Sequence, residues 1–172
     1  MIKDTINAFI QDYKQLMDVQ DKTLRHSKRL VEAISRHPVE IQSTLELINS
    51  GDCGLAALAI GIRLKRAGYN ISFFENSQHA YFGVDGYYYD TLIPEGTDDH
   101  KKMYGYTVDK PVKEQTVKQM HMSFMPYDSL GEGIANYFLV KHTQMRYPYK
   151  SLDASVQTRV IDGRIKEYPV VW

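Results

Sequence analysis

The sequence predicts an α+β fold, and three observations support that class. Apolar residues recur at helical spacing over residues 2–36. A second helical segment, rich in Ala and Leu and without proline, covers residues 53–67. Short β-rich segments follow, two of them separated by an Asp-Gly turn.

Composition limits the size and the class of the protein. The chain has 172 residues, of which 43% are hydrophobic and 24% charged, enough for one core. We expect a single domain in three consecutive parts: N-terminal helices at 1–48, a central part at 49–93, and C-terminal strands with a helix at 94–172.

Charge and cysteine content exclude several functions. Lys plus Arg equals Asp plus Glu at 21 each, which argues against a dedicated nucleic-acid binder. The single cysteine excludes an internal disulfide and a multi-cysteine zinc site, and no cofactor or metal motif stands out. The longest apolar run, residues 54–62, is too short to cross a bilayer. We therefore expect a cytoplasmic protein without a membrane partner, located in the host cytoplasm if a virus encodes it.

The N-terminal half is predicted to be helical, with one long helix or two shorter ones up to about residue 36. After the first helical region, His37-Pro38 breaks the pattern because proline disfavours a helical residue before it. Another short helix is predicted over residues 39–48, ended by residues 49–51. The helix at 53–67 has basic residues in its last turn and Gly68 just beyond it, a typical C-terminal signal.

Strands are predicted from Ile71 onward. Residues 71–74 form one strand, and residues 79–84 and 87–92 form a hairpin joined at Asp85-Gly86. The polar stretch at 95–110 is predicted to be a loop.

The C-terminal part is less strongly patterned. Residues 120–125 suggest another strand, residues 133–142 a helix, and residues 156–165 a strand with a turn at Asp162-Gly163.

Cys53 is the first candidate functional residue. A lone cysteine in an apolar helix is ordinarily a small core residue. Here it falls in the first turn of the predicted helix, after several possible N-cap residues at 49–52. Unpaired N–H groups and the helix dipole favour thiolate there, and thiolate is the nucleophilic form. Gly51 and Gly54 leave space around the sulfur.

A thiolate nucleophile requires a base and a group that orients the base, and the hairpin supplies both. With Asp85-Gly86 as a two-residue turn, His79 and Asp90 lie on the same sheet face as diagonal neighbours, within side-chain reach. A three-residue loop would put them on opposite faces. Taken alone, His79 is as consistent with a hydrogen-bonded structural histidine, and Asp90 with a residue that caps the turn after its strand.

These residues carry a family resemblance. The central part of the chain resembles the core of the transglutaminase-like cysteine hydrolases, part of the papain-like superfamily. The residues that carry the resemblance are Gly51-Asp52-Cys53 with Ala56, Ala57, Leu64 and Gly68, and then the run from His79 to Asp90. The resemblance covers residues 49–93. It implies a nucleophile-bearing helix packed on an antiparallel sheet, with Cys53 as nucleophile, His79 as general base and acid, and Asp90 as the orienting group.

That resemblance implies acyl transfer without a cofactor, on a protein or peptide substrate or a small amide. The Cys53 backbone N–H is the first candidate oxyanion donor; Asn49 is a weak second candidate and Gln42 a weaker one. Protease, deamidase and transglutaminase-like activities all stay open, as do the substrate and the oligomeric state.

Three alternatives remain. One is a purely structural protein in which Cys53 is a core residue. A non-catalytic interaction domain that retains the scaffold is suggested by the short segment between Cys53 and His79 and by the lack of a clear second oxyanion donor. His121 and Asp128 are the other pair that could act as base and orienting group.

Overall fold

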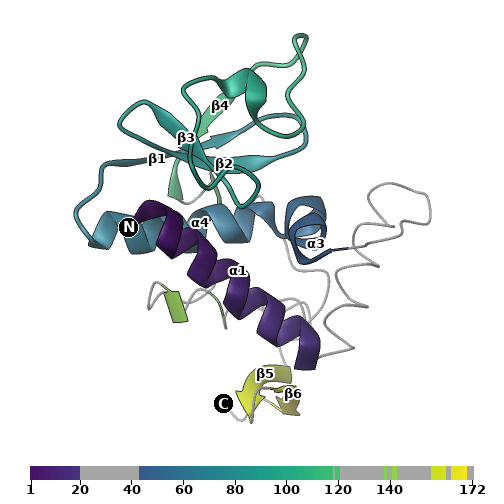
Figure 1. Ribbon diagram of the computed structural model, residues 1–172. Coiled ribbons are helices and arrows are strands. Elements are labelled where there is room, and N and C mark those ends of the chain that lie inside the picture. Colours follow the sequence, from purple (N-terminus) through teal and green to yellow (C-terminus); the bar gives the residue numbers. More distant parts are fainter. Residues whose placement is uncertain are drawn as a thin grey trace.

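The computed structural model describes residues 1–19, 43–117, 119–120, 138, 141–142, 156–161 and 164–169. It is a mixed helical and antiparallel β structure, as the sequence predicts (Figure 1). Residues 20–36 of the predicted N-terminal helical region lie outside the described residues. So do residues 121–125 of the predicted strand and most of the predicted helix at 133–142.

The described residues of the N-terminal part and of the segment that follows it include three helices. Helix α1 covers Ile2–Val19, α3 covers Thr44–Gly51 and α4 covers Cys53–Arg66. Helix α3 begins at Thr44 because Ser43 caps it, with its hydroxyl accepting a hydrogen bond from the Glu46 N–H. The predicted short helix is therefore present but extends to Gly51, and its predicted first residues lie outside the described part of the chain.

Helix α4 ends as the sequence predicts. Gly68 has a φ of +97°, a left-handed conformation that glycine adopts at little cost. The Gly68 N–H bonds the Lys65 carbonyl at 3.0 Å, and the Tyr69 N–H bonds the Leu64 carbonyl at 3.1 Å. This pair of hydrogen bonds is a Schellman motif, which satisfies carbonyls that the helix end would leave unpaired.

The larger sheet has the strand order β3-β2-β1-β4, with antiparallel neighbours throughout. Its strands are β1 (Ile71–Glu75), β2 (Ala80–Val84), β3 (Tyr87–Tyr89) and β4 (Lys113–Gln115). A separate pair consists of β5 (Val156–Ile161) and β6 (Arg164–Pro169). The predicted strand at 156–165 is thus two strands, and the residues of its predicted turn lie outside the described part.

The hairpin register is confirmed. Val84 pairs with Tyr87 and Phe82 with Tyr89, so the turn contains two residues. Asp85 and Gly86 both have positive φ, at 49° and 86°, as a type I′ turn requires. Both strands are shorter than predicted, because β2 begins at Ala80 and β3 ends at Tyr89.

Two predictions after residue 94 are wrong in part. The loop contains a short 3-10 helix, η1, at His100–Lys102, and the edge strand β4 follows it. Met120, predicted to begin a strand, is helical, and its N–H bonds the Thr116 carbonyl at 2.9 Å. Thr116 and Gln119 form a capping box, in which each side chain accepts from the other residue's backbone N–H.

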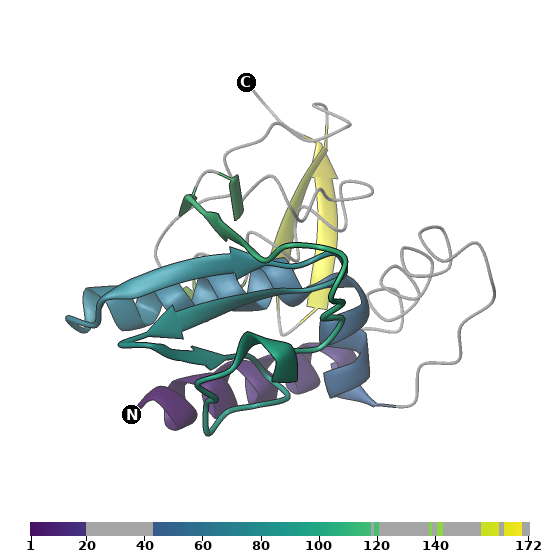
Figure 2. The ribbon, with the colours of Figure 1, turned by 90° about the horizontal axis from the view of Figure 1, so that it is seen from above.

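Helix α4 is the centre of the fold. It packs against β1 and β2 on one side and against α1 on the other (Figure 1). Seen from above in Figure 2, the teal strands run roughly along the helix. The residues of α4 are accordingly buried from Gly54 to Ile62, which confirms the expectation of a buried helix. Because α4 is enclosed, its first residue is held at a fixed position beside the sheet.

The close contact between α4 and β1 yields a test. A Cβ added at Gly61 would lie 2.5 Å and 2.8 Å from two ring carbons of the buried Phe73. We expect Gly61→Ala to lower the free energy of unfolding by about 1–3 kcal/mol through overpacking. Urea denaturation measures the change, and a Phe73→Leu background should reduce it. An equal loss in both backgrounds would contradict this packing.

Candidate functional site

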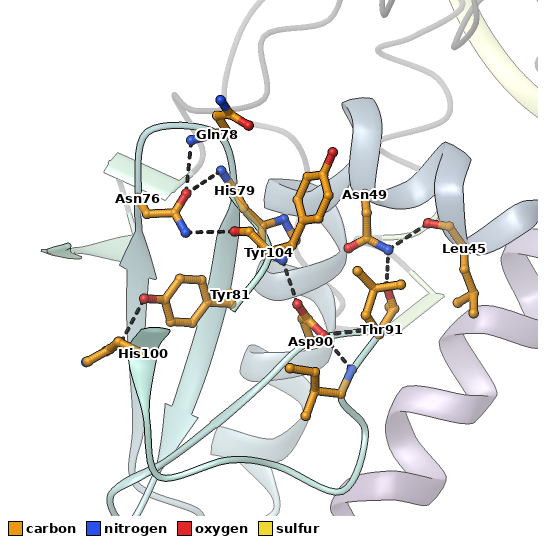
Figure 3. A network of polar contacts seen from close by, with 12 residues as sticks. Leu45, Asn49, Asn76, Gln78, His79, Tyr81, Asp90, Thr91, His100 and Tyr104 are labelled. Atoms are coloured by element: carbon orange, nitrogen blue, oxygen red, sulfur yellow. Dashed lines mark hydrogen bonds and ion pairs between the residues drawn. The ribbon is translucent and has the colours of Figure 1, made fainter. Parts of the chain in front are cut away.

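His79 and Asp90 form the best-defined polar contact of the site. The Nε2 atom of His79 lies 2.7 Å from Oδ2 of Asp90, and the two side chains are only 0% and 4% exposed (Figure 3). Because a carboxylate can only accept, Nε2 carries the hydrogen of this bond. The hairpin register predicted that these side chains lie within reach of each other, and the structure brings them together.

A second set of hydrogen bonds fixes the orientation of Asp90. Its Oδ1 accepts from the backbone N–H groups of Leu92 at 2.8 Å and Ile93 at 2.7 Å. The carboxylate therefore caps the turn after β3 with one oxygen and holds His79 with the other. Both sequence interpretations of Asp90 apply, each to a different oxygen atom.

The turn before β2 positions His79, and the sequence analysis missed its main residue, Asn76. Asn76 is buried, and its Oδ1 accepts from the N–H groups of Gln78 and His79, each at 2.9 Å. Its Nδ2 donates to the Tyr104 carbonyl at 2.8 Å. An asparagine that bonds the backbone two residues on is a turn signal visible in the sequence.

Aromatic rings enclose the imidazole. Tyr81 stacks with His79 at 6.0 Å between centroids, and Tyr104 meets it edge to face at 5.6 Å (Figure 3). The Tyr81 hydroxyl in turn lies 2.8 Å from Nδ1 of His100. Burial raises the pKa of Tyr81, and the charges of Tyr88 and Asp90 raise it further by smaller amounts. The Tyr81 hydroxyl therefore keeps its hydrogen at neutral pH.

Cys53 is the first residue of α4 and is partly buried. Its N-terminal neighbour Asp52 occupies the N-cap position, but its side chain makes no capping hydrogen bond. The Asp52 carboxylate instead accepts from the hydroxyl of the buried Tyr13, which ties α1 to the start of α4. Asp52 therefore anchors the helix start through Tyr13 rather than through a side-chain cap.

Cys53 and His79 line the same small pocket. The Nδ1 atom of His79, on the ring side away from Asp90, forms no hydrogen bond of ordinary geometry within the described residues. Burial lowers the pKa of His79. Hydrogen bonding to Asp90 and Cys53, together with the charges of these two residues, outweighs burial and raises the pKa to about 9. This environment favours a protonated imidazole at neutral pH.

Asn49 does not suit the oxyanion role suggested for it. It is buried, and its Nδ2 donates to the Leu45 carbonyl at 2.6 Å and to Oγ1 of Thr91 at 2.9 Å. A side-chain amide has two hydrogens, and both are used. Asn49 therefore has no donor left for an oxyanion, although it lines the pocket beside Cys53.

The remaining sequence candidates fall elsewhere. Gln42, His121 and Asp128 lie outside the described residues. Within the described ranges, no group of three or more His, Cys, Asp or Glu side chains is arranged to hold a metal ion. In the same ranges, no helix has both the length and the apolar character needed to span a membrane.

Comparisons with protein-family models, curated proteins and solved structures gave no match.

The raised pKa of His79 makes folding stability depend on pH. The folded pKa of about 9 exceeds the ordinary value of 6.5. The stabilisation is therefore fully present below about pH 6.5 and is lost as the pH rises through about 9. We expect the free energy of unfolding of the wild type to fall over this range relative to His79→Gln. Urea denaturation at several pH values tests this, and a pH-independent difference between the two proteins would contradict it.

Proposed function

We propose that this protein is a cysteine-dependent amide hydrolase or acyl transferase with a transglutaminase-like core of the papain-like superfamily. Cys53 is the nucleophile, His79 the general acid and base, and Asp90 the group that orients the imidazole. The observation that carries the proposal is the buried pair of His79 and Asp90, which leaves Nδ1 of the imidazole in the pocket that Cys53 also lines.

The first chemical step is attack of the Cys53 sulfur on an amide carbonyl carbon. The carbon–nitrogen bond breaks, the leaving amine takes the Nδ1 proton of His79, and the acyl group stays on the sulfur. The protonated imidazole that this step needs is the form favoured by the raised pKa of His79. The Cys53 backbone N–H is the candidate oxyanion donor, because the first N–H groups of a helix have no intrahelical acceptor.

Asp90 contributes orientation and charge. It keeps the hydrogen on Nε2, so that a neutral ring presents an accepting Nδ1 and a protonated ring a donating one. Substrates in keeping with this chemistry are a protein or peptide amide or a small amide. The site needs no cofactor for acyl transfer.

Alkylation by iodoacetamide tests the proposal. We expect native Cys53 to react at pH 6.5 faster than a free model thiol. We expect Asp90→Asn to slow the reaction by about tenfold or more, because an amide nitrogen facing Nε2 would impose the other tautomer. Mass spectrometry after timed quenching gives the rates. Circular dichroism checks that Asp90→Asn is folded, since its Oδ1 can still accept from Leu92 and Ile93.

Labelling with electrophilic peptide and glutamine-mimic probes tests catalytic competence and narrows the substrate. We expect wild-type protein to be labelled and Cys53→Ala not to be. If Cys53 reacts only after unfolding, the thiol is a structural core residue and the proposal fails. If Cys53→Ala keeps the full biological effect, a non-catalytic interaction domain explains the fold instead.

A further inference from the structure

The pocket beside Cys53 is small and carries two unpaired polar atoms. Its cavity volume is about 10 Å³, which is room for about one water molecule. Apolar side chains of α4 and β2, among them Ala56, Ala57 and Phe82, form much of its wall. The unpaired atoms belong to Asn49 and His79, which are only 5% and 2% exposed.

Hydrogen bonding fixes the orientation of the Asn49 amide. The Leu45 carbonyl can only accept, so the atom 2.6 Å from it must be the nitrogen of Asn49. The Oδ1 atom therefore takes the other position, and Figure 3 shows it turned to the side on which His79 lies. Within the described residues this oxygen is buried without a hydrogen-bond donor. A buried acceptor of this kind is costly unless a donor reaches it.

The second unpaired atom is Nδ1 of His79. Asp90 bonds Nε2, so Nδ1 is the ring atom on the side of Cys53, and it becomes available to a molecule in the pocket once the sulfur carries the acyl group. One water molecule can donate one hydrogen to Oδ1 of Asn49 and the other to a neutral Nδ1. Two unpaired polar atoms and room for one water are what a bound water molecule requires.

We propose that this pocket holds the water molecule that hydrolyses the acyl-enzyme, oriented by Oδ1 of Asn49 and activated by Nδ1 of His79. This inference rests on the proposed function. After acylation His79 is neutral, because it has given its proton to the leaving amine. The water oxygen then bonds to the acyl carbon, and one water hydrogen moves to Nδ1. The carbon–sulfur bond breaks with its electron pair on sulfur, which releases the carboxylic acid and restores thiolate and imidazolium.

Burst kinetics with p-nitrophenyl acetate separate the two steps. The nitrophenolate burst reports acylation of Cys53, and the later linear phase reports hydrolysis of the acyl-enzyme. We expect Asn49→Leu to keep the burst and to lower the linear phase by about 10- to 100-fold, the size of a positioning effect. Acetylated Cys53 should then accumulate in the intact-protein mass spectrum.

Thr91→Val is the matched control. It removes the hydroxyl that accepts from Nδ2 of Asn49 but leaves Oδ1 and the Leu45 hydrogen bond in place. We expect its linear phase to fall much less than that of Asn49→Leu. Equal losses in both variants, or an unchanged linear phase in Asn49→Leu, would overturn the water-positioning role while leaving the proposed function intact. A wild-type protein that shows no burst would overturn the proposed function and this inference together.

Discussion

The two oxygens of the Asp90 carboxylate hold the candidate site together. One oxygen bonds Nε2 of His79, and the other bonds the backbone N–H groups that follow β3. Because the group is buried, these hydrogen bonds are hardly weakened by solvent. Removing the charge would leave a buried imidazole without its partner and the turn with a weaker acceptor. The conformation of the turn after β3 and the orientation of the ring thus depend on one side chain.

The position of the sulfur depends on packing rather than on polar contacts. Helix α4 lies between the sheet and α1, so its first residue is held in place along with the buried residues that follow it (Figure 1). The hydroxyl of Tyr13 adds a direct link from α1 to Asp52, next to Cys53. The site therefore combines a buried ion pair, formed just before β2 and just after β3, with a helix start that core packing holds in place.

The sequence predicted well those parts of the site that local rules determine. Asp85-Gly86 specifies a two-residue turn, and the turn fixes which side chains share a face of the hairpin, so the contact between His79 and Asp90 could be anticipated. Glycine at position 68 likewise determines the end of α4. The role of Asn49 could not be predicted in this way, because it depends on Thr91, a residue distant in the sequence. Tyr104 lies beside His79 for a similar reason, since the loop after β3 is brought there by Asn76. The helix start at Thr116 did have a local signal, a capping box, that the strand interpretation of Met120 overlooked.

The central claim is that His79 is held as an imidazolium between Asp90 and the sulfur of Cys53. Titration of the His79 ring nitrogens by NMR measures this most directly. The account predicts a pKa near 9 in the wild type and a lower pKa in Cys53→Ala, which lacks the sulfur. A wild-type pKa at or below the ordinary value of 6.5, unchanged in Cys53→Ala, would contradict it.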